Sequence, residues 1–406
     1  MPAYSPLSKL AIKQHSSGHH RYTRDTQSST YNKIPTPQTY RSRNLNLAGI
    51  YIDQVAELPP KIDEYIRHIL GITSWEDRVT ASNQLQMQPR FNKLAEKLIA
   101  KSKEDASMCM LEAEWQTNLN YVLRAIANML EGGVQTNMSE KIWNADLKPR
   151  QASLDTLRNK VQDGTQTPIF DPAQTSSPRI DPNLTRVTDS DYSESMSPPS
   201  HAESAVSTTS TPSTNVTSAF HIRTPKPDIT VGLADKAFTP QQKLLLIYHQ
   251  AKKSILSEPH AAEMGIRFPF MIAETKGWSE KGTLLSAQNQ AAVGGACMLK
   301  ILKDLTDHAA RGIDLHPKQE SPPTTPEELS LAVALCFSVV SEGPVHELWV
   351  HFEREDGFYM HNLNVWRTTK RSHAEEFVNC LGRIIEWGKG DFKQGIVQKL
   401  GRVPEV

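Results

Sequence analysis

The sequence lacks most features that assign a chain to a class at first reading. It has no net charge, because 45 basic residues balance 45 acidic ones, so its overall field does not favour nucleic acid as a partner. No window approaches the roughly 18 consecutive apolar residues of a membrane span. The first residues lack the apolar stretch of a secretory signal. We therefore expect a nuclear or cytoplasmic protein without a membrane partner.

Cysteine is scarce as well. None of the spacings matches a CxxC pair or a mixed Cys/His metal site, which favours free thiols in a reducing compartment. A Walker loop, a G-x-S-x-G elbow and a Rossmann fingerprint are also missing, which argues against ATPases, hydrolases with that elbow and dehydrogenases. The four cysteines are Cys109, Cys297, Cys336 and Cys380.

Apolar side chains make up 38% of the chain, and two segments contain very few of them. Residues 1–44 are rich in Ser, Thr, His and basic residues, and residues 162–222 form a tract of Ser, Thr, Pro and Asp. Such segments cannot bury enough apolar surface to offset the entropy lost on ordering. We predict a disordered N-terminal tail and a disordered insert. The basic residues of the tail either are solvated, contact nucleic acid or form an import signal.

Helical periodicity dominates residues 45–161. Apolar residues recur at helical spacing after Pro59-Pro60, around Phe91 and again from Leu111 to Met129, where Gly132-Gly133 is a stop signal. We interpret this part as a helical region that includes the first helix of the core.

Residues 223–402 mix helix and strand patterns, which predicts an α/β (α+β) domain with a mixed sheet flanked by helices. Glu342-Gly343-Pro344 and Asp356-Gly357 are typical turn sequences. The expected elements are a strand after Pro227-Asp228, a helix beginning at Thr239-Pro240, a strand ending at Glu274, a helix over about 284–305, strands over about 332–341, 345–353 and 358–367, and a last helix around Phe377–Ile385.

A split acidic signature lies in this domain. Asp228 opens one strand, and Glu274-Thr275-Lys276 closes another. Because residues i and i+2 of a strand point to the same face, Glu274 and Lys276 can share one site. Two carboxylates and a lysine suit a hard divalent cation beside a phosphodiester. Without further support, Asp228 could cap a turn, and the other two could form a surface ion pair.

The order of these blocks resembles the PD-(D/E)XK nuclease superfamily, with its restriction-endonuclease-like fold, and more closely fungal proteins that carry a nuclease-like domain of this type. The likeness covers about residues 223–402. The stretches that carry it are Pro-Asp-Ile-Thr-Val-Gly (227–232), Phe-Pro-Phe-Met-Ile-Ala-Glu-Thr-Lys-Gly (268–277), Ala-Gln-Asn-Gln-Ala-Ala-Val-Gly-Gly-Ala-Cys-Met (287–298), His-Glu-Leu-Trp-Val-His-Phe (346–352) and Val-Trp-Arg-Thr-Thr (365–369).

The resemblance implies a nuclease that hydrolyses phosphodiester bonds of DNA or RNA with Mg²⁺ or Mn²⁺. Asp228 and Glu274 would bind the metal, and Glu114 of the upstream helix resembles an acid that some members add. Lys276 would orient the attacking water or neutralise charge on the phosphoryl oxygens. Gln288 is either a further catalytic residue or a structural one with a satisfied amide.

Two alternatives remain open at this stage. Arg367, Lys370 and Arg371 form a small basic cluster that either contacts nucleic acid phosphates or is solvated. The separation of 46 positions from Asp228 to Glu274 exceeds the usual hairpin of this superfamily, so the helix between them must be an insertion that leaves the strands paired. A catalytically inactive interaction module with the same fold is the alternative function.

Overall fold

The core of the protein is one mixed sheet of seven strands, in the order β1-β7-β6-β5-β4-β3-β2. The computed structural model describes residues 35–80, 87–139, 141–149, 221–278, 282–315 and 335–404. The strands are β1 (Ile50–Ile52), β2 (Val134–Met138), β3 (Ile229–Ala234), β4 (Ile266–Lys276), β5 (Cys336–Glu342), β6 (Val345–Arg354) and β7 (Gly357–Arg367).

Both parallel and antiparallel pairs occur in this sheet. β4 and β5 are parallel, as are β1 and β7. The pairs β2–β3, β3–β4, β5–β6 and β6–β7 are antiparallel. Parallel neighbours need a long crossover, and the helix between β4 and β5 supplies it. The α/β class with a mixed sheet is therefore confirmed.

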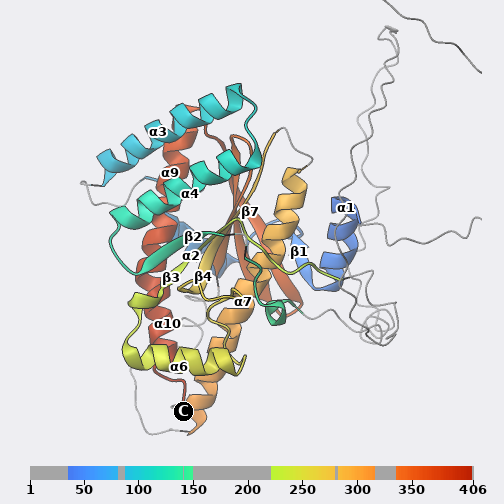
Figure 1. The fold of residues 1–406 in the computed structure, drawn as a ribbon, viewed down its shortest axis with the longest axis vertical. Helices are drawn as coiled ribbons and strands as arrows, with labels where there is room; N and C mark the ends of the chain where they lie inside the picture. Colours follow the sequence, from blue (N-terminus) through green and yellow to red (C-terminus); the bar gives the residue numbers. More distant parts are fainter. Residues whose placement is uncertain are drawn as a thin grey trace, which may run out of the picture. The chain divides into compact units, whose positions relative to one another are not determined.

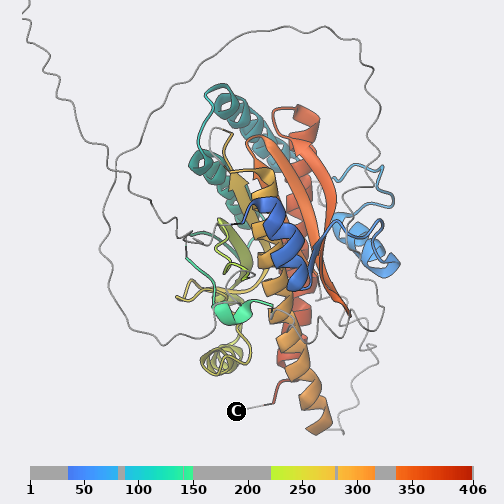
Figure 2. The same cartoon turned by 90° about the vertical axis from the view of Figure 1, so that its right-hand side faces the viewer.

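Helices cover the two faces of the sheet (Figures 1 and 2). The crossover helix α7 packs against β4, β5, β6 and β7, and it also contacts α1 and η1. α3, α4 and α9 contact one another on the opposite face. The helices are α1 (Pro37–Thr39), the π-helix η1 (Tyr40–Leu45), α2 (Pro60–Leu70), α3 (Gln88–Ser107), α4 (Glu112–Met129), η2 (Ala145–Leu147), η5 (Asp235–Ala237), α6 (Pro240–Ala251), α7 (Leu284–Leu315), α9 (Arg371–Trp387), η6 (Gly388–Phe392) and α10 (Lys393–Leu400).

Alternation along β5 explains this layering. Successive side chains of a strand point to opposite faces. Ser338 accordingly hydrogen-bonds His351 beneath α7, whereas Phe337 packs edge-on against Trp387 of α9. A Cβ added to Gly295 of α7 would lie 2.0 Å from the His351 ring, so a small residue is what lets the helix approach the sheet so closely.

Ordered structure begins earlier in the chain than the sequence predicts. α1 and η1 fall inside the tail predicted for residues 1–44, so that boundary is wrong for residues 37–44. Burial is the reason: Leu45 is fully buried, and the Tyr40 hydroxyl accepts a hydrogen bond from the Arg223 backbone N–H at 2.9 Å. The rest of that tail, residues 1–34, lies outside the described residues.

The region 45–161 is not purely helical either. β1 and β2 belong to it and form the two edges of the sheet, so the sheet is not confined to residues 223–402. Nearly all of the predicted insert, residues 162–220, lies outside the described residues, and Ile222 at its end is already buried. Among the described helices, none is both long and apolar enough to cross a bilayer.

Candidate active site

The two halves of the acidic signature lie on neighbouring strands. β3 and β4 pair antiparallel, with Ile229 opposite Ala273, so Asp228 comes next to Glu274 at the end of the ladder. The Asp228 Oδ2 atom accepts a hydrogen bond from the Thr275 backbone N–H at 2.7 Å. The long connection between the strands carries α6, which starts with a capping box at Thr239. β3 and β4 therefore pair although α6 lies between them in the chain.

Glu274 is the most unusual group of the site. Its side chain is buried, with 1% of the residue exposed, and its Oε2 atom has no hydrogen-bond partner among the described residues. Burial, followed by repulsion from Asp228, raises the pKa of Glu274 well above its ordinary value. Burial also raises the pKa of Asp228 to about 6, although the charge of Lys276 lowers it. Two desolvated carboxyl groups therefore lie next to each other, where β3 begins and β4 ends.

Lys276 carries a charge in the same place. Its Nζ donates to the Glu112 Oε1 atom at 2.9 Å and to the Thr275 carbonyl oxygen at 2.8 Å. Burial opposes its charge, but the carboxylates of Asp228, Glu112 and Glu274 outweigh this and raise the pKa of Lys276. The lysine is therefore a stable cation within a cluster of three acidic groups.

The acid of α4 that contacts Lys276 is Glu112, whereas the Oε2 atom of Glu114 is buried without a hydrogen-bond partner among the described residues. Glu112 is the first residue of α4, and the backbone of Gly277 lies against it. Two positions apart on a helix, side chains diverge by about 200°. No hydrogen bond or ion pair within the described chain joins Glu114 to Asp228, Glu274 or Lys276. The apolar stripe of the helix could not distinguish the two glutamates, because the entry of α4 at Gly277 is a tertiary contact.

Gln288 lies in a different polar cluster. Its Nε2 donates to the Glu347 Oε2 atom at 2.7 Å, and its Oε1 accepts from Arg41 Nη2 at 2.7 Å. Trp349 Nε1 also donates to Glu347 Oε2, and Arg41 Nε donates to Asn289 Oδ1. Both ends of the Gln288 amide are therefore used by protein groups, which favours the structural role. Arg41 was not identifiable from sequence because it lies in the predicted tail.

The three basic residues predicted for nucleic acid differ in their surroundings. The Arg367 guanidinium lies 5.4 Å from the centre of the Trp278 ring. Arg371 is close to two glutamates, Glu96 at 3.3 Å and Glu375 at 3.6 Å. Lys370 precedes α9 and is exposed. The charge of Arg371 is thus matched locally, whereas Arg367 makes no ion pair with a described carboxylate.

The strand register brings Arg367 to the same end of the sheet as the acidic site. Lys276 pairs with Glu342, Glu342 with Val345, and Val345 with Arg367. This row crosses β4, β5, β6 and β7. At about 4.8 Å per strand, it spans roughly 14 Å from Lys276 to Arg367.

The histidines of β6 do not form a metal site. His346 stacks on Phe377 of α9, and His351 hydrogen-bonds Ser338 beneath α7, so they lie on opposite faces of the sheet as alternation predicts. Burial lowers the pKa of each to about 3. Within the described ranges, no group of three or more His, Cys, Asp or Glu side chains is placed to hold a metal ion. Asp228 and Glu274 form a pair rather than a complete cage.

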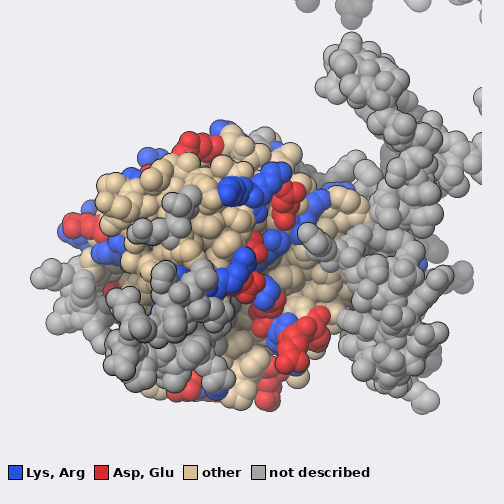
Figure 3. Space-filling view, turned by 90° about the horizontal axis from the view of Figure 1, so that it is seen from below, with Lys and Arg blue, Asp and Glu red and all other residues tan. Residues whose placement is uncertain are grey.

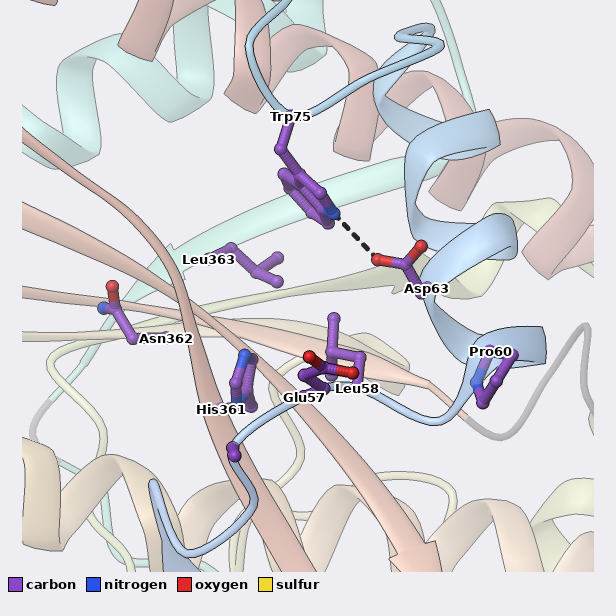
Figure 4. Close-up of a pocket in the computed structure, with 9 residues that line it drawn as sticks. Glu57, Leu58, Pro60, Asp63, Trp75, His361, Asn362 and Leu363 are labelled. Carbon is purple, nitrogen blue, oxygen red and sulfur yellow. Dashed lines mark hydrogen bonds between the residues drawn. The ribbon is translucent and has the colours of Figure 1, made fainter.

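A cavity of about 500 Å³ lies away from the acidic site, between the segment that follows β1 and strand β7 (Figure 4). Trp75 donates from Nε1 to Asp63 at its rim, and Glu57 adds a second acid. Neither lysine nor arginine is among its lining residues, so it does not suit a phosphodiester. The chemistry of the acidic site is therefore a better guide to function than the size of this cavity.

The surface carries no field of one sign on the face drawn in Figure 3, where basic and acidic side chains are interspersed. This agrees with the zero net charge of the chain. Any attraction for a polyanion must therefore be local.

The family described as Domain of unknown function (DUF7924) matches residues 120–400, more than two thirds of the chain. The chain belongs to this family. The matched residues include Asp228, Glu274 and Lys276, but begin after Glu112. Comparison with curated proteins gave no match, and comparison with solved structures gave none.

Proposed function

We propose that this member of the DUF7924 family is a divalent-metal-dependent nuclease that hydrolyses phosphodiester bonds in nucleic acid. The observation that carries the proposal is the buried Glu274 carboxyl, whose Oε2 atom has no partner, beside Asp228 and Lys276. A buried polar atom without a partner costs free energy, and one that lies beside a second carboxyl group and a lysine is a candidate for binding a cation. The resemblance to the PD-(D/E)XK superfamily points to the same residues.

The residues at this site fit Mg²⁺ or Mn²⁺. Asp228 and Glu274 offer carboxylate oxygens, the ligands that hard cations prefer. Mg²⁺ commonly uses only one or two protein carboxylates and completes its shell with water and phosphate oxygens, so a pair is sufficient. When bound, such a cation polarises the scissile phosphate and lowers the pKa of a bound water. Its charge would also favour the ionised forms of both carboxyl groups, whose pKa values are raised chiefly by burial.

The chain's own residues would act on the remaining charges. Water attacks the phosphorus atom, the bond to the leaving oxygen breaks, and the proton lost by the water ends on that oxygen. Lys276, held as a cation by its acidic neighbours, would donate hydrogen bonds to the attacking water or to the phosphoryl oxygens where negative charge develops. To do so, Nζ would exchange its bond to Glu112 for the substrate. Glu112 is thus a positioning residue: its hydrogen bond to Nζ holds the Lys276 side chain at the site and favours its charged form.

The proposed place of action is the nucleus or the cytoplasm. This rests on the four cysteines, which are all free thiols, three of them buried.

A cleavage assay tests the function. Labelled DNA and RNA, single-stranded and duplex, are incubated with the full chain in Mg²⁺, in Mn²⁺ and in a chelator, beside the variants Lys276→Ala and Asp228→Asn. Each variant should lose at least about 100-fold in rate, since removing one charge-stabilising donor costs about 10²–10³. Lys300→Ala is the matched control: Lys300 also pairs with a carboxylate, Asp304 at 2.9 Å. It lies 16 residues along α7 from Leu284, about 24 Å at the usual helical rise.

The outcomes separate the alternatives. Metal-dependent cleavage that both site variants lose and Lys300→Ala keeps would support the proposal. Equal cleavage by wild type and Lys276→Ala would overturn the mechanism. Absence of cleavage in every substrate and metal would overturn the nuclease function and favour an inactive interaction module with this fold.

A further inference from the structure

Trp278 is an exposed aromatic side chain close to the candidate site in the chain. It lies two residues beyond Lys276, at most about 7 Å along the backbone, and 40% of it is exposed. What distinguishes this indole from the other exposed apolar side chains of the described residues is its position next to Lys276 of the proposed site.

The indole is held in place rather than loose. One face of the indole lies against the turn between β5 and β6, where a Cβ on Gly343 would lie 2.7 to 2.9 Å from the ring atoms Nε1, Cε2 and Cδ1. Gly343 has φ +56°, a left-handed conformation that favours glycine, and its N–H donates to the Lys276 carbonyl oxygen at 2.9 Å. The turn therefore supports Trp278 and links it directly to the strand that carries Glu274 and Lys276.

Arg367 completes the arrangement. Its guanidinium lies 5.4 Å from the indole centroid, within the range of a cation–π contact. Its backbone N–H donates to His373 Nδ1, and its side chain is exposed and makes no ion pair with a described carboxylate. Glu342, the acid of this row, instead accepts a hydrogen bond from the N–H of Leu284 at the start of α7. The positive charge of Arg367 is therefore available to a phosphate.

We propose that Trp278 and Arg367 form a stacking platform for an unpaired nucleotide next to the scissile phosphate, so that the substrate is single-stranded nucleic acid. The inference deepens the proposed nuclease function and rests on it for the position of the scissile phosphate. Base stacking on an aromatic ring needs a free base face, which a duplex covers with neighbouring base pairs. A local aromatic and cationic platform also suits a protein with no net charge, because stacking does not depend on a large basic field.

Binding without metal tests the platform separately from cleavage. Fluorescence anisotropy with labelled single-stranded DNA, single-stranded RNA and duplex DNA, all in a chelator, compares wild type with Trp278→Ala, Trp278→Phe and Arg367→Gln. Loss of one aromatic platform should weaken single-strand binding by about 5- to 100-fold. Trp278→Phe should recover most of it, and Arg367→Gln should also flatten the salt dependence of the dissociation constant.

Trp75→Ala is the matched control, because Trp75 is also 40% exposed but lies at the separate cavity beside Asp63. It should bind like wild type. Circular dichroism and urea unfolding of each variant detect misfolding, and the phenylalanine variant keeps the test valid if the alanine variant is unstable.

Equal dissociation constants for Trp278→Ala and Trp75→Ala would overturn the platform, as would a wild type that binds duplex as tightly as single strands. If wild type cleaves single strands and Trp278→Ala cleaves them equally well, the platform is overturned and the proposed nuclease function is kept. Trp278-dependent binding of single strands without cleavage in Mg²⁺ or Mn²⁺ would overturn the nuclease and leave the platform. The DNA and RNA arms identify which nucleic acid is bound.

Discussion

Replacing Asp228 by asparagine should stabilise the metal-free protein at neutral and alkaline pH. The pKa of Asp228 is raised from 3.8 to about 6, chiefly because burial disfavours the charged form. A group with a raised pKa in the folded state supports folding fully below its unfolded pKa, and this support disappears as pH rises through the folded pKa. The difference between the two pKa values corresponds to a cost of about 3 kcal/mol at pH 8. Asparagine carries no charge and can still accept the Thr275 N–H.

Urea unfolding between pH 4 and pH 8 measures this effect. In a chelator, Asp228→Asn and wild type should be similar near pH 4, and the variant should become more stable by up to about 3 kcal/mol above pH 6. Mg²⁺ or Mn²⁺ should reverse the order, because a cation at 1,000 times its dissociation constant adds about 4.1 kcal/mol to wild type. Asp146→Asn is the control: the pKa of this exposed carboxyl is lowered by its bond to Lys253, so its replacement should not stabilise the protein.

Two results would refute the reasoning. A variant Asp228→Asn that is no more stable than wild type at pH 8 would mean that the carboxylate is not desolvated as the structure indicates. If Asp228→Asn is more stable than wild type but Mg²⁺ or Mn²⁺ does not raise the stability of wild type, the buried pair is not a cation site.

Three further predictions concern the fold around the site. Burial lowers the pKa of His351 to about 3, so between pH 6.5 and about 3 the unfolded chain binds a proton that the folded chain does not, and the free energy of unfolding falls by about 1.4 kcal/mol per pH unit. His351→Gln should remove this contribution. An unchanged pH dependence in urea unfolding would contradict the prediction. Gly295→Ala should destabilise the protein by about 1–3 kcal/mol through overpacking, whereas Gly390→Ala, with nothing within 4 Å, should not, as thermal unfolding would show. Gln288→Ala should lower the free energy of unfolding by about 1–3 kcal/mol because Glu347 loses a hydrogen bond, and the cleavage rate should change little. Loss of cleavage at unchanged stability would instead make Gln288 catalytic.

Local patterns predicted the C-terminal strands well. The strands expected over about 345–353 and 358–367 are observed as β6 and β7, with bounds that differ by one residue where they differ at all. Gly343 and Gly357 mark the turns between β5, β6 and β7, because glycine allows the backbone conformations that tight turns need. The capped start of α6 at Thr239 was equally visible, since the capping interactions span only three residues.

The N-terminal part was predicted less well for a physical reason. β1 is three residues long and β2 five, too short for alternation to be distinct from chance. The segment Pro37–Leu45 has a polar composition that suggests a tail, yet Tyr40 and Arg41 anchor it to partners more than 180 residues away. Such long-range contacts leave no periodic trace in the sequence.

The candidate site divides in the same way. Asp228, Glu274 and Lys276 could be recognised from the sequence as chemically suited to one site, because residue type and the two-residue repeat of a strand are local properties. Four contacts became visible only in the folded chain. β3 and β4 pair although α6 lies between them, and Glu112 rather than Glu114 contacts Lys276. Gln288 hydrogen-bonds Arg41 and Glu347, and Arg367 lies against the Trp278 ring. Each of these depends on strand pairing and helix docking between distant segments, which are selected by burial of the whole core and not by any one stretch of sequence.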